Sequence, residues 1–187
     1  ASLPFHPAVE LSWESKITML SDSVFAINAT SYGFYLFRLD IKSGKITCNG
    51  KKILPSYKIN CLLFDKDKRL WAGTSEGLLK QKLNPSLISS SHFPPATGDT
   101  VTGGFTCVYR HRDKLYAGRY SLNKGLLIVN PLTMQALKQI DFFGGKSAWN
   151  EIQSIEMYHP DTLWIGTSAG ILWFDTQTDH YGKMQDN

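Results

Sequence analysis

Two short segments of the sequence have the spacing of a nucleophilic serine. Residues 73–77 read GTSEG and residues 166–170 read GTSAG, and both fit the Gly-x-Ser-x-Gly pattern that exposes a serine hydroxyl at a sharp turn. That chemistry requires a strand followed by a helix, whereas each turn here is followed by an aliphatic segment typical of another strand. The motif also occurs twice, although one active site needs one nucleophile. We therefore expect turns of a repeated scaffold and no catalytic residue.

A second group of residues could bind a metal ion. His111 and His159 each lie four residues before a repeated leucine, and Asp113 and Asp161 lie two residues before it. Neighbouring repeats would bring these four groups to one face. Asp and Pro are also ordinary turn residues, so we favour a structural role for them and expect neither a metal nor any other cofactor.

Both serine-containing segments belong to a pattern that occurs four times. LWAGTSEGL begins at Leu70 and LWIGTSAGI at Leu163, and weaker relatives begin at Val24 and Leu115. The four starting residues recur every 45 to 48 residues. This period is typical of the blades of a β-propeller.

Each repeat contains the apolar segments of four short strands. One segment precedes the starting residue, the pattern itself is the second, a third follows the turn glycine, and a weaker one ends the repeat; none has a helical period. One four-stranded sheet cannot bury its own faces, so neighbouring repeats must stack. The sequence therefore predicts an all-β fold, a β-propeller of four-stranded antiparallel blades that forms a single segment over residues 1–187. The expected blades span about residues 16–54, 57–91, 103–141 and 150–184.

Large aromatic residues at the second position of the pattern are suited to packing between blades. We expect Trp71, Tyr116 and Trp164 to occupy equivalent places and to be buried there. The glycines two residues later indicate close approach of the backbone, and the glycines of the following turns are expected to have positive φ. These two sets are Gly73, Gly118 and Gly166, and Gly77, Gly125 and Gly170.

The cysteines fit the same framework. Cys61, Cys107 and Ser154 fall at one position of the innermost strand, and Met19 is expected to be the fourth member of the set. The chain has 3 cysteines and no C-x-x-C pair. This favours buried thiols over a disulfide framework or a zinc site.

The third repeat is interrupted, and this interruption predicts the ligand site. From starting leucine to turn glycine it has 10 residues instead of 7, and the connections before repeats three and four are also long. These loops emerge on one face of a propeller, and their Arg, Tyr, Trp and Asn side chains suit sugar rings or acidic sugars. The candidate ligand-binding residues are Arg119, Tyr120, Asn123, Phe143, Lys146, Trp149 and Asn150.

Composition limits the class of protein. The net charge of +4 arises from 20 basic and 16 acidic residues, and the basic residues stand at separate turn-like places, so no nucleic-acid partner is expected. The longest apolar runs are far too short to span a bilayer. The first residues lack the features of an intact signal peptide, and we expect the chain to have been cut from a longer one.

The segments LLFDKDKRLWAGTSEGLL and IEMYHPDTLWIGTSAGILWFD resemble the two-component-regulator propeller repeat. The resemblance is strong in repeats two and four, fair in three and weak in one. It implies a bacterial sensor propeller on the periplasmic side of the inner membrane, which responds to carbohydrate-type ligands and signals to a linked kinase, regulator or cyclase. The chain departs from the family in having four repeats instead of the usual seven.

Three functions follow as alternatives. The first is a non-catalytic, ligand-binding sensor segment that takes a small molecule or oligosaccharide and meets a membrane only through the full-length protein. The second is a protein-interaction scaffold propeller with a polypeptide partner. The third is a metal-dependent propeller lyase that uses His111, His159, Asp113 and Asp161.

Four blades of a larger propeller would leave apolar end faces in water, which is rare for soluble monomers. We therefore expect the chain to require further propeller blades, from its own gene or from a second copy of the chain. The alternative is closure as a small four-bladed ring, in which residues 5–13 add a strand to the fourth blade.

Overall fold

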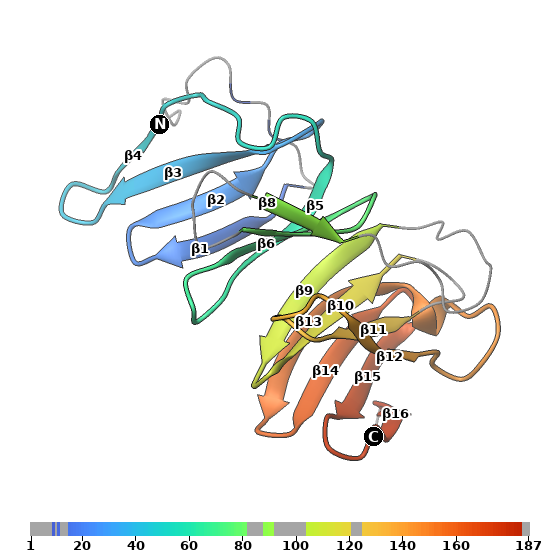
Figure 1. Cartoon of the computed structure of the whole chain (residues 1–187). Helices are drawn as coiled ribbons and strands as arrows, with labels where there is room; N and C mark the ends of the chain where they lie inside the picture. The colour runs from blue at the N-terminus through green and yellow to red at the C-terminus, as the bar shows by residue number, and fades with distance from the viewer. Residues whose placement is uncertain are drawn as a thin grey trace.

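The computed structural model describes residues 9, 11, 15–81, 88–91, 104–120 and 125–184. In these residues the chain forms four antiparallel sheets of four strands, and each sheet keeps its strands in chain order (Figure 1). The predicted all-β fold of four-stranded blades is confirmed.

Blade 1 contains β1 (Ile17–Ser21), β2 (Val24–Asn28), β3 (Phe34–Asp40) and β4 (Lys45–Cys48), and blade 2 contains β5 (Ile59–Phe64), β6 (Leu70–Thr74), β7 (Leu78–Gln81) and β8 (Ile88–Ser91). Blade 3 contains β9 (Phe105–His111), β10 (Lys114–Arg119), β11 (Leu126–Val129) and β12 (Ala136–Ile140), and blade 4 contains β13 (Ile152–His159), β14 (Thr162–Thr167), β15 (Gly170–Asp175) and β16 (Tyr181–Lys183). The helical element of the described residues is a short 3₁₀ turn, η1 (Ala148–Asn150).

The blades stack in chain order because each sheet has an apolar face on both sides. The first strands lie next to one another, with β5 between β1 and β9, and with β9 against β13. One buried cluster separates each pair of neighbouring blades: Leu62 packs with Ala26 between blades 1 and 2, and Trp71 packs among residues of blade 3. The inner strands of blades 2 and 3 are therefore covered on both sides, as their continuous apolar runs predict.

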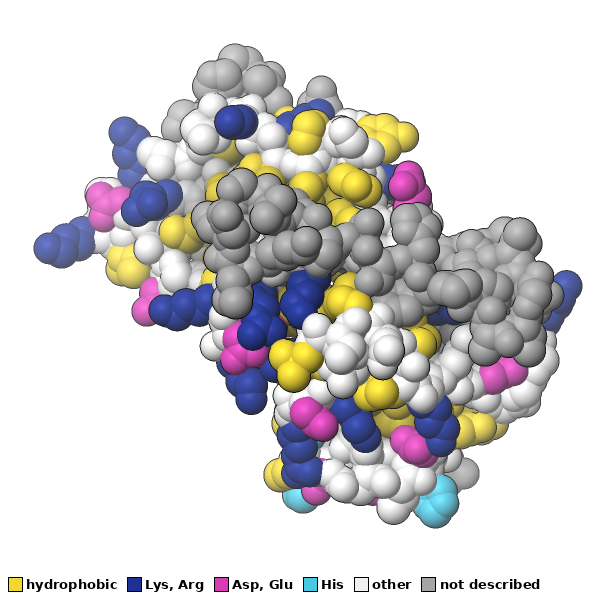
Figure 2. Space-filling view, viewed as in Figure 1, with side chains coloured by type: hydrophobic (Ala, Val, Ile, Leu, Met, Phe, Trp, Pro, Cys, Tyr) yellow, Lys and Arg dark blue, Asp and Glu magenta, His cyan; other side chains and the backbone are white. Residues whose placement is uncertain are grey.

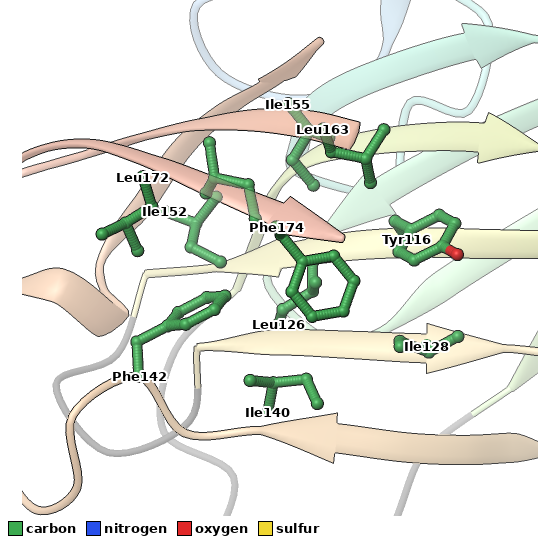
Figure 3. Close-up of a cluster of buried hydrophobic side chains, with 11 residues drawn as sticks. Tyr116, Leu126, Ile128, Ile140, Phe142, Ile152, Ile155, Leu163, Leu172 and Phe174 are labelled. Atoms are coloured by element: carbon green, nitrogen blue, oxygen red, sulfur yellow. The ribbon is translucent and has the colours of Figure 1, made fainter. Parts of the chain in front are cut away.

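The junction of blades 3 and 4 shows how these faces interlock. Tyr116 and Phe142 contact the ring of Phe174 edge to face, with both pairs of ring centroids 6.3 Å apart. Figure 3 shows Phe174 between these two rings, with aliphatic side chains of both blades around it. Burial of this many apolar groups makes the junction a continuous core rather than a contact between independent sheets.

The strand register confirms that Trp71, Tyr116 and Trp164 are equivalent. Each lies two residues before the strand glycine that pairs with Cys61, Cys107 or Ser154 on the innermost strand. The close approach expected at these glycines is also present, since a Cβ on Gly118 would lie 2.6 Å from the Cys107 sulfur.

Blade 1 differs from the sequence prediction by one residue. Asn28 pairs with Phe34, the first residue of β3, as Gly73 pairs with the first residue of β7. The residue equivalent to Leu70 is therefore Phe25, and the assignment of Val24 as the start of the repeat was wrong. The assignment of Met19 to the inner position was also wrong, because Met19 pairs with Phe25. Lys16, whose carbonyl accepts from the Asn28 amide, occupies that position instead.

The turn glycines follow the prediction in two blades of three. Gly77 and Gly170 have φ values of 155° and 138°. Gly125 lacks a positive φ. It is required by space instead: a Cβ there would lie 2.6 Å from both the Ile140 carbonyl and the Asn150 side-chain oxygen.

The two ends of the stack are unequal. On blade 1, Val9 and Leu11 pack against a buried cluster that includes Tyr35 and Phe37. These two residues therefore lie on blade 1, whereas ring closure would need the segment of residues 5–13 to pair with blade 4. On blade 4, the outer face carries Tyr158, Ile171 and Trp173, which are 63%, 48% and 37% exposed. We call this the end face.

Trp164 belongs to the end face, and the prediction that it is buried between blades was wrong. Its ring is half-buried and stacks on Tyr158 with centroids 4.3 Å apart, whereas Trp71 and Tyr116 are 0% and 1% exposed. The difference arises because blades 3 and 4 cover Trp71 and Tyr116, while no described residue forms a blade beyond the fourth. Blades 1 and 4 lie at opposite ends of the stack (Figure 1).

Candidate functional site

The turns after the second strands of blades 1, 2 and 4, together with the connections that follow blades 1 and 3, form one face of the molecule, which we call the loop face. In blades 2 and 4 a threonine closes the turn: Thr74 Oγ1 donates to the Gly77 carbonyl and Thr167 Oγ1 to the Gly170 carbonyl, both at 2.8 Å. Both serine-containing motifs are therefore turns between two strands. This geometry lacks the strand-to-helix turn that a nucleophilic serine requires.

Blade 3 has an arginine where the other two blades have this threonine. Arg119 follows Gly118 as Thr74 follows Gly73, and its side chain is 3% exposed. Its guanidinium carbon lies 5.2 Å from the centroid of the Phe105 ring. Burial lowers the pKa of Arg119, and its Nε has no hydrogen-bond partner. In the described part of the chain, no ion pair compensates this buried charge.

The connection between blades 3 and 4 is held by one buried amide. Asn150 is 0% exposed; its side-chain oxygen accepts from the Phe142 amide at 2.7 Å, and its Nδ2 donates to Asp141 at 2.5 Å and to the Gly145 carbonyl at 3.4 Å. Ser147 caps η1 by accepting from the Trp149 amide at 3.3 Å. Asn150 therefore shapes the loop from inside rather than facing a ligand.

Residues of this loop and of β16 form an aromatic cluster, which we call the platform. It consists of Phe143, Trp149, Tyr181 and Lys183. Phe143 contacts Trp149 and Tyr181 edge to face, with centroid distances of 5.7 and 5.3 Å. The ammonium of Lys183 lies 4.8 Å from the centroids of both Phe143 and Trp149. Phe143 is 44% exposed and has a φ of 62°, a conformation that bulky residues rarely adopt. The loop thus holds a partly exposed apolar ring at a conformational cost.

The other candidate ligand residues lie around these two features. Tyr120 is 53% exposed and pairs through its backbone with Glu151, which joins the end of β10 to the platform loop. Lys146 is exposed on the same loop. Asn123 lies outside the described residues.

Two platform residues, Tyr181 and Lys183, were missed by sequence reasoning. The ligand-binding residues predicted from the sequence come from the loops, whereas Tyr181 and Lys183 belong to β16, the weakest strand of the repeat. Their alternate spacing in the segment HYGKM is the one signal that both face the same way.

The histidine and aspartate group does not come together as a metal site. Asp161 pairs with Arg112 at 2.7 Å and accepts from Gln177 at 3.1 Å. His111 is buried. Among the residues that the structure describes, no three His, Cys, Asp or Glu side chains form a group that could hold a metal ion.

The thiols line the inner strands as structural groups. Burial raises the pKa of Cys61 to about 12 and that of Cys107 to about 11. Because the thiolate is the reactive form, both groups are unreactive at neutral pH.

The surface charge is mixed: Figure 2 shows Lys and Arg side chains spread among acidic and neutral ones on the face in view.

The stacked four-stranded sheets define a segment of a β-propeller. Within it, residues 53–76 match the model of the two component regulator propeller family, and the chain thus carries a repeat of that family. This is the family that the repeated Leu-Trp-small-Gly-Thr pattern predicted. No curated protein is a recognisable relative of the chain.

Solved structures show the same fold at low sequence identity. The extracellular domain of BT4673 from B. thetaiotaomicron, named as a hybrid two component system, aligns over 98% of this chain with a TM-score of 0.67 and 18% identity. The extracellular domain of BT3049 from the same organism, also named as a hybrid two component system, aligns over 83% with a TM-score of 0.56 and 21% identity. PorZ, a surface component of the type-IX secretion system of Porphyromonas gingivalis, aligns over 91% with a TM-score of 0.66 and 15% identity. The chain spans 24%, 19% and 27% of these three structures, respectively.

In the described residues, no helix is long and apolar enough to cross a membrane.

Proposed function

We propose that the chain is a non-catalytic, ligand-binding segment of a bacterial sensor propeller and that its ligand is a carbohydrate. The platform is the observation that carries this proposal, because it brings the exposed Phe143 ring, the half-buried Trp149 ring and the Lys183 ammonium together at the loop face. The family repeat supports the sensor role, and the extracellular neighbours support a position outside the inner membrane. A linked signalling module and the membrane contact would belong to the full-length protein.

The platform suits a sugar for a physical reason. Sugar rings present apolar C–H faces edged by hydroxyl groups, so they stack on aromatic rings while donors at the edge bind the hydroxyls. Phe143 and Trp149 supply the rings, and Lys183 supplies donors beside them. Since Asn150 already holds the loop in shape, little conformational entropy is lost when a ligand binds.

The test is a binding screen of neutral and acidic oligosaccharides with the purified chain, followed by titration of each hit. Trp149→Ala should weaken binding of a hit by about 1–3 kcal/mol, a magnitude measured for stacking on an aromatic ring. Tyr158→Ala, which removes an exposed aromatic residue of the end face, is the matched control and should bind as the wild type does. Equal affinity of wild type and Trp149→Ala would contradict the proposal.

The end face favours one further proposal about partners: it packs against another propeller blade, from the same gene or from a second copy of the chain. Trp164 occupies the place that is fully covered in blades 2 and 3, and Ile171 and Trp173 extend the apolar area around it. A scaffold that binds an unrelated polypeptide remains the second candidate function, since such a face could also receive a foreign partner.

A further inference from the structure

The junction of blades 2 and 3 contains a buried cation without a counter-charge. Arg119 is 3% exposed, its Nε has no hydrogen-bond partner, and no ion pair joins its guanidinium to another of the described residues. A buried charge without a partner is costly, and native proteins keep such groups where they have a task. The Phe105 ring beneath the guanidinium offers only its electron-rich face.

The repeat itself shows that this arginine is not needed for the fold. Thr74 and Thr167 hold the same position in blades 2 and 4 and close their turns with a hydroxyl. Blade 3 gives up this bond and buries a guanidinium instead. The substitution therefore weakens the local structure, and a gain outside the free chain must offset it.

Two further donor groups lie at the loop-face ends of the innermost strands in this part of the molecule. The ammonium of Lys16 donates to the Thr106 carbonyl at 2.8 Å, one residue from Phe105, at the loop-face end of the innermost strands. The amide of Asn60 lies at the same junction, since a Cβ on Gly104 would be 2.6 Å from its Nδ2. The strand ends of this junction thus carry hydrogen-bond donors, and no neighbouring carboxylate raises the pKa of Arg119, which burial lowers.

We propose that this junction binds the carboxylate of a small organic acid, with Arg119 as the residue that receives it. The planar guanidinium matches the two oxygens of a carboxylate and binds it through paired hydrogen bonds. Because so little of the side chain is exposed, the ligand enters with a small terminal group. The site goes beyond the platform: Arg119 lies between blades 2 and 3, and the platform lies between blades 3 and 4.

The experiment measures thermal unfolding and calorimetric titration of the purified chain with acetate, glucuronate and glucose, at constant ionic strength. Acetate and glucuronate should raise the unfolding temperature and bind saturably, whereas glucose should do neither at this site. Arg119→Thr, which installs the residue of blades 2 and 4, should remove carboxylate binding, and Arg119→Lys should weaken it by about tenfold because the fork is lost.

The outcomes separate this proposal from the platform. Trp149→Ala should bind acetate as the wild type does, even where it has lost an oligosaccharide. Absence of carboxylate binding to the wild type would overturn the proposal, and so would undiminished binding to Arg119→Thr. A third contrary result is a large drop in the unfolding temperature of ligand-free Arg119→Thr, since that would show that the arginine serves the fold itself.

Discussion

At the scale of single residues, the tryptophan at the second position of the repeat has a different environment in blade 2 and in blade 4. Trp71 is fully buried and donates its indole N–H to Asp65 at 2.9 Å. Asp65 also accepts from the guanidinium of Arg110 in blade 3 at 2.5 Å, so this carboxylate joins an aromatic anchor to the next blade. Trp164 has the same place in blade 4 but lacks a covering blade.

We predict that this difference governs stability. Trp71→Ala should lower the free energy of unfolding by about 3–5 kcal/mol, because a large ring is removed from a closed core. In the monomeric chain, at a protein concentration low enough to prevent self-association, Trp164→Ala should cost about 1 kcal/mol or less, as exposed substitutions do. Denaturant titration of the two variants measures both, and equal losses would show that the end face is covered in solution.

Asp65 should make stability depend on pH. Burial alone would raise the pKa of Asp65, but hydrogen bonds from Trp71, Arg69 and Arg110 outweigh it and lower that pKa below its ordinary value. A carboxyl with a lowered pKa in the folded state contributes stability above the unfolded pKa of about 4 and loses it as the pH falls further.

Asp65→Asn should therefore lower the free energy of unfolding by about 1–3 kcal/mol at neutral pH and flatten its decline below about pH 4. Thermal unfolding of both proteins between neutral pH and pH 3 checks this. Parallel pH profiles would contradict the assignment.

At the scale of elements, the loops between blades carry the specific features, while the sheets repeat. The connection of blades 3 and 4 has four ordered parts: the Asn150 amide, the Ser147 cap, the left-handed Phe143 and the two glycines that follow it. Such a loop presents a fixed surface because its polar groups are satisfied internally.

Asn150→Ala tests this interpretation. It should lower the free energy of unfolding by about 2 kcal/mol, since the Phe142 amide and Asp141 lose a buried partner, and it should also weaken any platform ligand. Asn130→Ala is a suitable control, because Asn130 caps the turn after β11 with a bond of 2.8 Å to the Leu132 amide, at an exposed site. A smaller loss is expected there, with ligand affinity unchanged. Undiminished ligand affinity in Asn150→Ala would separate the platform from the loop that we assign to it.

At the scale of the whole molecule, the stack ends in an apolar face. Tyr158, Trp164, Ile171 and Trp173 form on blade 4 the kind of surface that blades 2 and 3 bury. Contiguous patches of this kind mark interaction sites on soluble proteins.

We predict that the isolated chain self-associates through the end face. Sedimentation should show species larger than the 21.0 kDa monomer, and Ile171→Glu combined with Trp173→Glu should restore the monomer without a loss of unfolding temperature. Lys42→Glu combined with Lys45→Glu, a charge change at exposed residues of blade 1, is the control and should leave association unchanged. A compact wild-type monomer that unfolds cooperatively would refute the need for further blades.

The sequence by itself determined the repeated unit. The pattern recurs every 45 to 48 residues, each repeat has four apolar strand segments, and a glycine stands two residues after the aromatic residue of the second segment. These features define the blades wherever the pattern is strong. The pattern is weak in the first repeat, where the predicted starting residue, Val24, was wrong by one position. This repeat lacks the Gly-Thr pair, and without it the sequence does not distinguish Val24 from its apolar neighbour Phe25. The long loops of the third repeat likewise pointed to the loop face from spacing alone.

Only the tertiary structure decided what each repeated residue experiences. Trp71 and Trp164 differ because burial depends on the neighbouring sheet, which local sequence does not encode. The platform joins Phe143 and Trp149 to Tyr181 and Lys183 of another strand, and such a contact follows from how the blades stack. Arg119 looked like a surface loop residue, yet it is buried, because the register places it against Phe105 inside the junction of two blades.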